Sequence, residues 1–105
     1  MSIVRLADAM ILEVAILNVK PQQEADFEHS FGLASRIIAS MKGYRRHELR
    51  RCLEIANQYL LLVEWDTLED HTVGFRGSDQ YQEWRRLLHH FYDPFPTVEH
   101  YEAVI

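Results

Sequence analysis

The sequence predicts one α+β domain, in which a four-stranded antiparallel sheet carries two helices on one face. The main observation is that the hydrophobic period changes along the chain between that of a strand and that of a helix, in the order β-α-β-β-α-β. The second is composition, because 48% of the 105 residues are hydrophobic and 26% are charged, which suits a single compact core. We therefore expect one domain over residues 10–105, preceded by an N-terminal arm over residues 1–9.

The first half of the domain predicts a strand followed by an amphipathic helix. Residues 10–19 are mostly aliphatic and β-branched, as in a strand. Pro21 then suits the first turn of a helix, and residues 22–41 have apolar positions at spacings of three and four. The acids Glu24 and Asp26 lie near the start, where the helix dipole favours negative charge. The apolar face of this helix consists of Phe27, Phe31, Ala34, Ile38 and Met41.

Two further strands follow, joined by a short hairpin connection at residues 54–58. Residues 59–66 are strongly apolar and predict a central strand, whereas residues 44–53 carry four arginines, which suits an edge strand protected by charge. This edge could also receive an anionic substrate, but pairing of the arginines with nearby acids is the simpler interpretation. The arginines are Arg45, Arg46, Arg50 and Arg51, and the candidate acids are Glu48, Glu13 and Glu64.

The last third of the chain predicts a short helical turn, a second helix and a final strand. Thr67 is a suitable N-cap for a turn that ends near Val73. Ser78 can cap a helix over residues 79–91, which Pro94 and Pro96 end. Residues 97–104 then form the last strand. The apolar face of the second helix consists of Tyr81, Trp84, Leu87, Leu88 and Phe91.

The two central strands are apolar on both faces, although helices can cover only one face of the sheet. In the first strand Leu12, Val14 and Ile16 oppose Ile11, Ala15 and Leu17, and in the third Leu61, Val63 and Trp65 oppose Leu60 and Leu62. An exposed apolar sheet face of this kind usually marks a protein interface. We therefore expect a homodimer that packs sheet face to sheet face.

Charge and cysteine content exclude several other classes of protein. A formal net charge of −5 argues against a nucleic-acid partner, which needs a basic face. No apolar run approaches the ~18 residues of a membrane-spanning helix, so we expect no membrane partner and a cytoplasmic protein. The single cysteine, Cys52, is read as a small buried hydrophobe, and the six scattered histidines lack the spacing of metal ligands.

With these elements in place, nearly the whole chain from Met10 onward resembles the antibiotic biosynthesis monooxygenase family of dimeric α+β barrels, whose topology is ferredoxin-like. The most diagnostic residues are Glu64-Trp65 at the end of the third strand, His71 in the short helix, and then Phe75 and Ser78. The matching stretches are VEWDTLEDHTVGFRGSDQYQEWRRLLHHFYDPFPTVEHY and PQQEADFEHSF.

The resemblance implies a small monooxygenase that acts on an aromatic, phenolic or quinol-like compound with dioxygen and without a cofactor. A deprotonated phenol is electron-rich enough to react with dioxygen, so the protein need only bind the ring, assist proton removal and exclude water. The alternative is a non-catalytic or non-oxygenase barrel that binds a small hydrophobic ligand, because this fold serves many functions. An active oxygenase requires a titratable group that opens onto the cavity, whereas a binding protein does not.

The candidate site lies between the helices and the helix-facing side of the sheet, near Trp65, His71 and Phe75. Strand alternation puts Trp65 on that side, and the short helix carries His71 back over the end of the third strand. For each residue a structural role competes, namely core packing for the aromatic residues and a surface position for the histidines. The catalytic candidates are His71, Trp65, His47 and His100, and the candidates for binding the ring are Phe75, Tyr81 and Trp84.

Haem degradation is a third activity in this family, and the sequence does not favour it. The haem-degrading members pair an Asn in the first strand with a Trp and a His in the helical region. Here Asn18 lies near the end of the first strand and the short helix contains no Trp. We therefore expect neither haem nor a metal.

Overall fold

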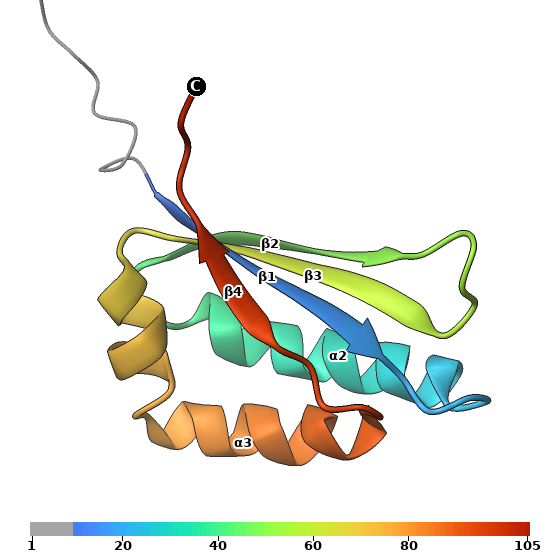
Figure 1. The fold of residues 1–105 in the computed structure, drawn as a ribbon. Coiled ribbons are helices and arrows are strands. Elements are labelled where there is room, and N and C mark those ends of the chain that lie inside the picture. Colours follow the sequence, from blue (N-terminus) through green and yellow to red (C-terminus); the bar gives the residue numbers. More distant parts are fainter. Residues whose placement is uncertain (1–9) are drawn as a thin grey trace, which may run out of the picture.

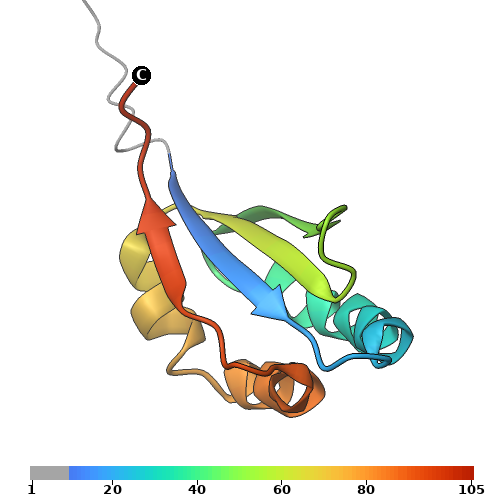
Figure 2. The same ribbon diagram turned by 45° about the vertical axis from the view of Figure 1, so that its right-hand side comes forward.

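The computed structural model describes residues 10–105, and the N-terminal arm expected over residues 1–9 lies outside the described residues. Four strands form one antiparallel sheet in the order β2-β3-β1-β4. Both helices lie on the same side of this sheet (Figures 1 and 2). The ferredoxin-like α+β topology expected from the sequence is confirmed. The strands are β1 (Ile11–Asn18), β2 (Tyr44–Arg51), β3 (Gln58–Trp65) and β4 (Val98–Tyr101).

The first helix, α2 (Glu24–Ala39), buries the apolar stripe that its sequence predicts, except that Met41 follows the helix. It begins three residues after Pro21, which lies in a turn and not in the first helical turn. The next residue, Gln22, has a φ of 71°, a left-handed conformation that no helix continues through. The turn therefore delays the start of the helix.

The second helical region divides into three parts. Thr67 Oγ1 accepts the backbone N–H of Asp70 at 3.1 Å and precedes a π-helical turn, η1 (Asp70–Phe75), which extends two residues beyond the predicted end at Val73. Ser78 Oγ accepts the N–H of Tyr81 at 3.1 Å and caps α3 (Asp79–Leu88), as predicted. The expected single helix over residues 79–91 ends at Leu88, because the chain tightens into a 3₁₀ turn, η2 (His89–Phe91).

The core lies between the helices and one face of the sheet. Every second residue of the central strands points toward the helices, and these residues are buried from Glu13 to Leu17 in β1 and from Tyr59 to Trp65 in β3. In the described part of the chain no helix covers the opposite face, where Ile16 is 50% exposed (Figure 2). The helix-facing buried residues of β1 and β3 are Glu13, Ala15, Leu17, Tyr59, Leu61, Val63 and Trp65.

The arginines of β2 form ion pairs along this edge strand, in agreement with the simpler interpretation of the cluster. Arg46 pairs with Glu64 of the neighbouring strand at 2.9 Å, and Arg51 reaches Glu28 of α2 at 2.6 Å. Exposed pairs of this kind contribute little stability, so their role is to protect the edge. One suggested partner was wrong, because Glu13 lies on the helix-facing side of the sheet and pairs with none of these arginines.

Candidate functional site

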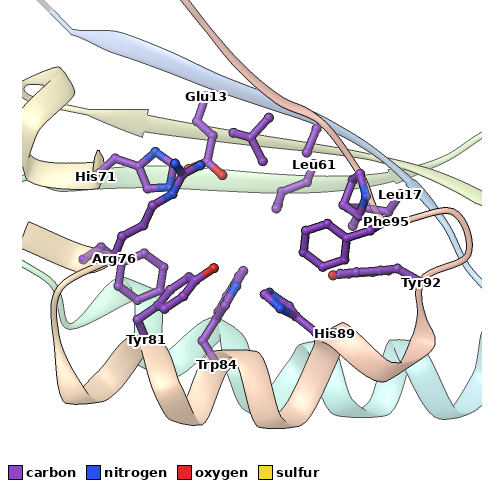
Figure 3. Close-up of a pocket in the computed structure, with 14 residues that line it drawn as sticks. Glu13, Leu17, Leu61, His71, Arg76, Tyr81, Trp84, His89, Tyr92 and Phe95 are labelled. Carbon is purple, nitrogen blue, oxygen red and sulfur yellow. The ribbon is translucent and has the colours of Figure 1, made fainter. Parts of the chain in front are cut away.

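A cavity of about 390 Å³ lies between the helix-facing side of the sheet and the segment from η1 to the start of β4 (Figure 3). This volume is within the range of sites for small organic molecules. Its wall is largely aromatic, with four polar side chains gathered around it. The aromatic residues are Phe75, Tyr81, Trp84, Tyr92 and Phe95, and the polar ones are Glu13, His71, Arg76 and His89.

Glu13 is the buried acid of this cavity. It lies in the middle of β1, in phase with Ala15 and Leu17, so strand alternation points its side chain toward the helices. The residue is 5% exposed, and Trp65 Nε1–H donates a hydrogen bond to its Oε1 at 2.9 Å. Burial raises the pKa of Glu13 from 4.5 to about 7, an effect that the Trp65 hydrogen bond and the Arg76 charge only partly offset. Near neutral pH this carboxyl group can therefore both release and accept a proton.

His71 lies beside Glu13 and is held from three sides. The chain turns back after β3, and η1 places the imidazole, which is 3% exposed, over the end of that strand. Its Nε2 is 3.3 Å from Glu13 Oε1, and its ring stacks on Trp65 with centroids 5.3 Å apart. Its Nδ1 is 2.7 Å from His100 Nε2. Burial, with the charges of Arg76 and His100, lowers the pKa of His71 to about 3, so this ring is neutral at physiological pH.

Arg76 gives the cavity a positive charge. It follows η1 directly, and Figure 3 shows its side chain extending toward Glu13 and His71. Its charge lowers the pKa of Glu13, His71 and His100. Within residues 10–105 it forms no ion pair with a carboxylate at contact distance, so its charge is available to an anion in the cavity.

The structure brings together most of the residues that the sequence selected. His71, Phe75, Tyr81 and Trp84 all line the cavity. Trp65 is fully buried and does not line it, but touches two of the polar residues that do, Glu13 and His71.

His100 and His47 occupy unlike positions. His100 contacts His71 from β4 without lining the cavity. His47 lies apart from this cavity, with its Nδ1 2.6 Å from Tyr44 Oη and its ring near Phe31 of α2. The expectation that His47 reaches this cavity was therefore wrong.

Five of the aromatic and polar residues that line the cavity had not been selected as part of a substrate site. Glu13 had a sequence signal, because an acid in the inward phase of an apolar strand must find a buried partner. Arg76 follows the diagnostic Phe75 directly. The other three depend on how the chain returns from α3 to β4, which no local pattern predicts. The five residues are Glu13, Arg76, His89, Tyr92 and Phe95.

Across residues 10–105, no group of three or more His, Cys, Asp or Glu is arranged to hold a metal ion. No helix in the same range is long and apolar enough to cross a membrane.

Comparison with known proteins places this fold and cavity in a family. The family model for antibiotic biosynthesis monooxygenases matches residues 10–87, which include β1, η1 and most of α3. The chain belongs to the antibiotic biosynthesis monooxygenase family. The matched segment of this chain contains Glu13, His71 and Arg76.

The chain is also similar to individual proteins. The chain is 58% identical over 95 residues to the uncharacterized protein YczJ of Bacillus subtilis, covering 90% of this chain and all of that protein. A Bordetella bronchiseptica structure, provisionally assigned as an antibiotic biosynthesis monooxygenase, is 36% identical with a TM-score of 0.88 and coverage of 92% and 99%. SnoaB of Streptomyces nogalater, a cofactor-independent oxygenase, shares the fold at 20% identity, with a TM-score of 0.71 and coverage of 92% and 93%.

Proposed function

We propose that the chain is a small cofactor-independent monooxygenase that acts on an aromatic, phenolic or quinol-like compound in the cavity of Figure 3. The observation that carries this proposal is the buried Glu13–His71 pair, which opens onto an aromatic-walled cavity. A protein that only binds a hydrophobic ligand gains nothing from an ionisable pair whose burial costs free energy. The likeness to SnoaB, a cofactor-independent oxygenase, supports the same reaction class.

The reaction requires the substrate to supply the electrons that reduce dioxygen. A phenol of the anthrone type loses a proton, and the resulting anion adds dioxygen at carbon to give a hydroperoxide. Loss of water then leaves a carbonyl group, so that R₂CH₂ and O₂ yield R₂C=O and H₂O. Proton removal in a dry cavity is the step that a protein can accelerate without a cofactor.

Each part of the cavity has a task in this scheme. Phe75, Tyr81 and Trp84 hold the planar ring by stacking and exclude water. The Glu13–His71 pair takes up the proton, with Trp65 fixing the carboxyl group by its hydrogen bond. Arg76, which the scheme adds to the residues selected from sequence, stabilises the substrate anion by its charge. His47 has no part in the scheme.

The proposal includes a homodimer formed through the uncovered face of the sheet. Apolar side chains gather there on the central strands and on the segments beside them, and a hollow of about 510 Å³ runs between them. A second copy of the chain would remove this apolar surface from water. The cytoplasmic location expected from the sequence belongs to the same proposal. The apolar residues of this face include Val14, Ile16, Leu60, Leu62, Phe95 and Tyr101.

The test is oxygen consumption by metal-free protein with hydroquinone and with dithranol, a hydroxylated anthrone, as probes. The expected result is saturable uptake above the protein-free rate, and its loss in Glu13→Gln. The matched control is Glu28→Gln, since Glu28 lies on α2 with Tyr59 and Arg51 as partners and outside the cavity. Saturable binding of both probes without oxygen uptake would instead show a ligand-binding barrel.

A further inference from the structure

Three polar side chains form a continuous line from the cavity to the edge of the sheet. Glu13 Oε1 lies 3.3 Å from His71 Nε2, and His71 Nδ1 lies 2.7 Å from His100 Nε2. The three residues come from β1, η1 and β4. Glu13 and His100 are also cross-strand partners in the sheet, so the backbone register holds both ends of the line. Burial falls along it, because Glu13 and His71 are buried and His100 is part-exposed.

Glu13 and His71, the two members of the line that border the cavity, differ in what they can do for a substrate. Both ring nitrogens of His71 are engaged, so this residue can accept a substrate proton only by breaking one of its contacts. Glu13 uses one carboxyl oxygen for Trp65 and His71, and among residues 10–105 nothing is hydrogen-bonded to the other. Figure 3 shows the carboxyl group of Glu13 at the cavity. Glu13 is therefore the member of the line that meets the substrate.

We propose that Glu13 takes the substrate's proton and that His71 and His100 conduct protons between Glu13 and solvent at the β4 edge. This inference rests on the proposed function and refines it. Glu13 is then the catalytic base, and the two histidines are positioning residues that act through it. Their task is to carry the proton away from Glu13, so that its carboxylate forms again while a bound ring closes the cavity to water.

The proton transfer is balanced, and both imidazole rings are neutral before and after it. Glu13 gives its proton to His71 Nε2 while His71 Nδ1–H passes to His100 Nε2, and His100 Nδ1–H passes to water. Three N–H or O–H bonds break and three form, leaving a Glu13 carboxylate, two neutral imidazoles and one proton in solvent. The reverse sequence returns a proton, such as the one that the hydroperoxide needs when water leaves.

The surrounding charges favour this mode of transfer. Arg76, from the end of η1, disfavours a positive charge on His71 and His100. Tyr92, which follows η2, interacts with Glu13 and stays neutral because burial raises its pKa. Trp65 on β3 donates a hydrogen bond to Glu13 and carries no charge. The remaining titratable groups at the cavity, Tyr81 and His89 of the α3 side, have no hydrogen bond to the line within the described chain. A proton therefore passes along the line without resting on either imidazole.

The kinetic experiment uses His100→Gln with dithranol as the probe. Glutamine can still donate to His71 Nδ1 but cannot relay a proton, so kcat should fall at least about tenfold while KM stays unchanged. Added imidazole should restore kcat, because it supplies the missing proton carrier. The matched control is His90→Gln, at an exposed histidine in η2, which should behave as the parent. An unchanged kcat in His100→Gln would overturn the relay.

A second experiment does not depend on turnover and so separates failure of the relay from failure of the proposed function. In ¹⁵N-histidine-labelled protein, the ring nitrogens of His71 and His100 should shift together at the pH where Glu13 titrates. The common step should vanish in Glu13→Gln, and the His71 step should change in His100→Gln, which alters only a part-exposed residue. Persistence of the parent titration in both variants would overturn the relay. A linked titration without oxygen uptake from any probe would retain the relay and refute the oxygenase.

Discussion

Replacing Glu13 by glutamine should remove activity and, at alkaline pH, stabilise the fold. In the folded protein burial raises the pKa of Glu13 to about 7 against an ordinary value of 4.5. Since one pKa unit corresponds to about 1.4 kcal/mol, ionising this carboxyl group costs the folded state about 3 kcal/mol. The side chain is 5% exposed, so solvent screening removes little of this cost.

The sign of the change in unfolding free energy depends on whether the folded or the unfolded state has the higher pKa for Glu13. A folded-state pKa above the unfolded value gives stability that is present below pH 4.5 and is lost as the pH rises to about 7. Glutamine has no proton to lose, and its amide can still accept from Trp65 and donate to His71. Relative to the parent, Glu13→Gln should therefore gain ~2–3 kcal/mol of unfolding free energy between pH 5 and pH 8.

The assay is urea unfolding of both proteins at pH 5 and pH 8, at one fixed protein concentration because a dimer's stability depends on it. The difference between variant and parent isolates Glu13 from other titrating groups, including His71, whose lowered pKa destabilises the fold as the pH falls from 6.5 to about 3. The control is Glu28→Gln, whose pKa is lowered by Tyr59 and Arg51, and which should shift stability nearly equally at both pH values. If Glu13→Gln changed the unfolding free energy by the same amount at pH 5 and pH 8, the raised pKa of Glu13 would be refuted.

Further predictions concern the reaction, the dimer and haem. With dithranol, kcat/KM should rise as the pH passes about 7 and Glu13 ionises, and a flat profile would contradict its role as base. His71→Ala should lower turnover ~10²-fold while the dimer persists, whereas turnover equal to that of the parent would show that His71 has no role in the reaction. Leu62→Glu should cost on the order of 3–5 kcal/mol of association or folding, seen by sedimentation as loss of the dimer, and Leu53→Glu, at a side chain 91% exposed, should not. Titration with haemin should give no saturable Soret shift, and a stoichiometric shift would contradict the cofactor-free account.

Hydrophobic period and capping predicted the elements of this fold well, because they depend on local chemistry. The apolar strands at the centre and the arginine-rich strand at the edge follow from burial and from edge protection. The end of the second helix was less predictable. The 3₁₀ turn at His89–Phe91 depends on how the chain packs against the segment that follows β1, where the backbone N–H of Lys20 donates to the Phe91 carbonyl at 2.8 Å.

The candidate site was predicted where residues adjacent in sequence stay adjacent in space. Trp65 and His71 meet because a short turn joins β3 to η1. Glu13 was missed, although strand alternation places it inward, since its partners come from η1 and β3, far along the chain. His47 was misplaced because β2 lies across β3 from β1, at the opposite side of the sheet from the cavity wall. Such distances across the sheet are set by strand order and register.

The central claim is that the protein alone directs one atom of dioxygen into an aromatic substrate. The most direct measurement is turnover of dithranol under ¹⁸O₂ by metal-free protein, with mass analysis of the quinone product and of the water. We expect one labelled oxygen atom in the product and the other in water, at a rate that falls to the protein-free level in Glu13→Gln and stays at the parent level in Glu28→Gln. Label absent from the product, or equal rates for parent and Glu13→Gln, would contradict it.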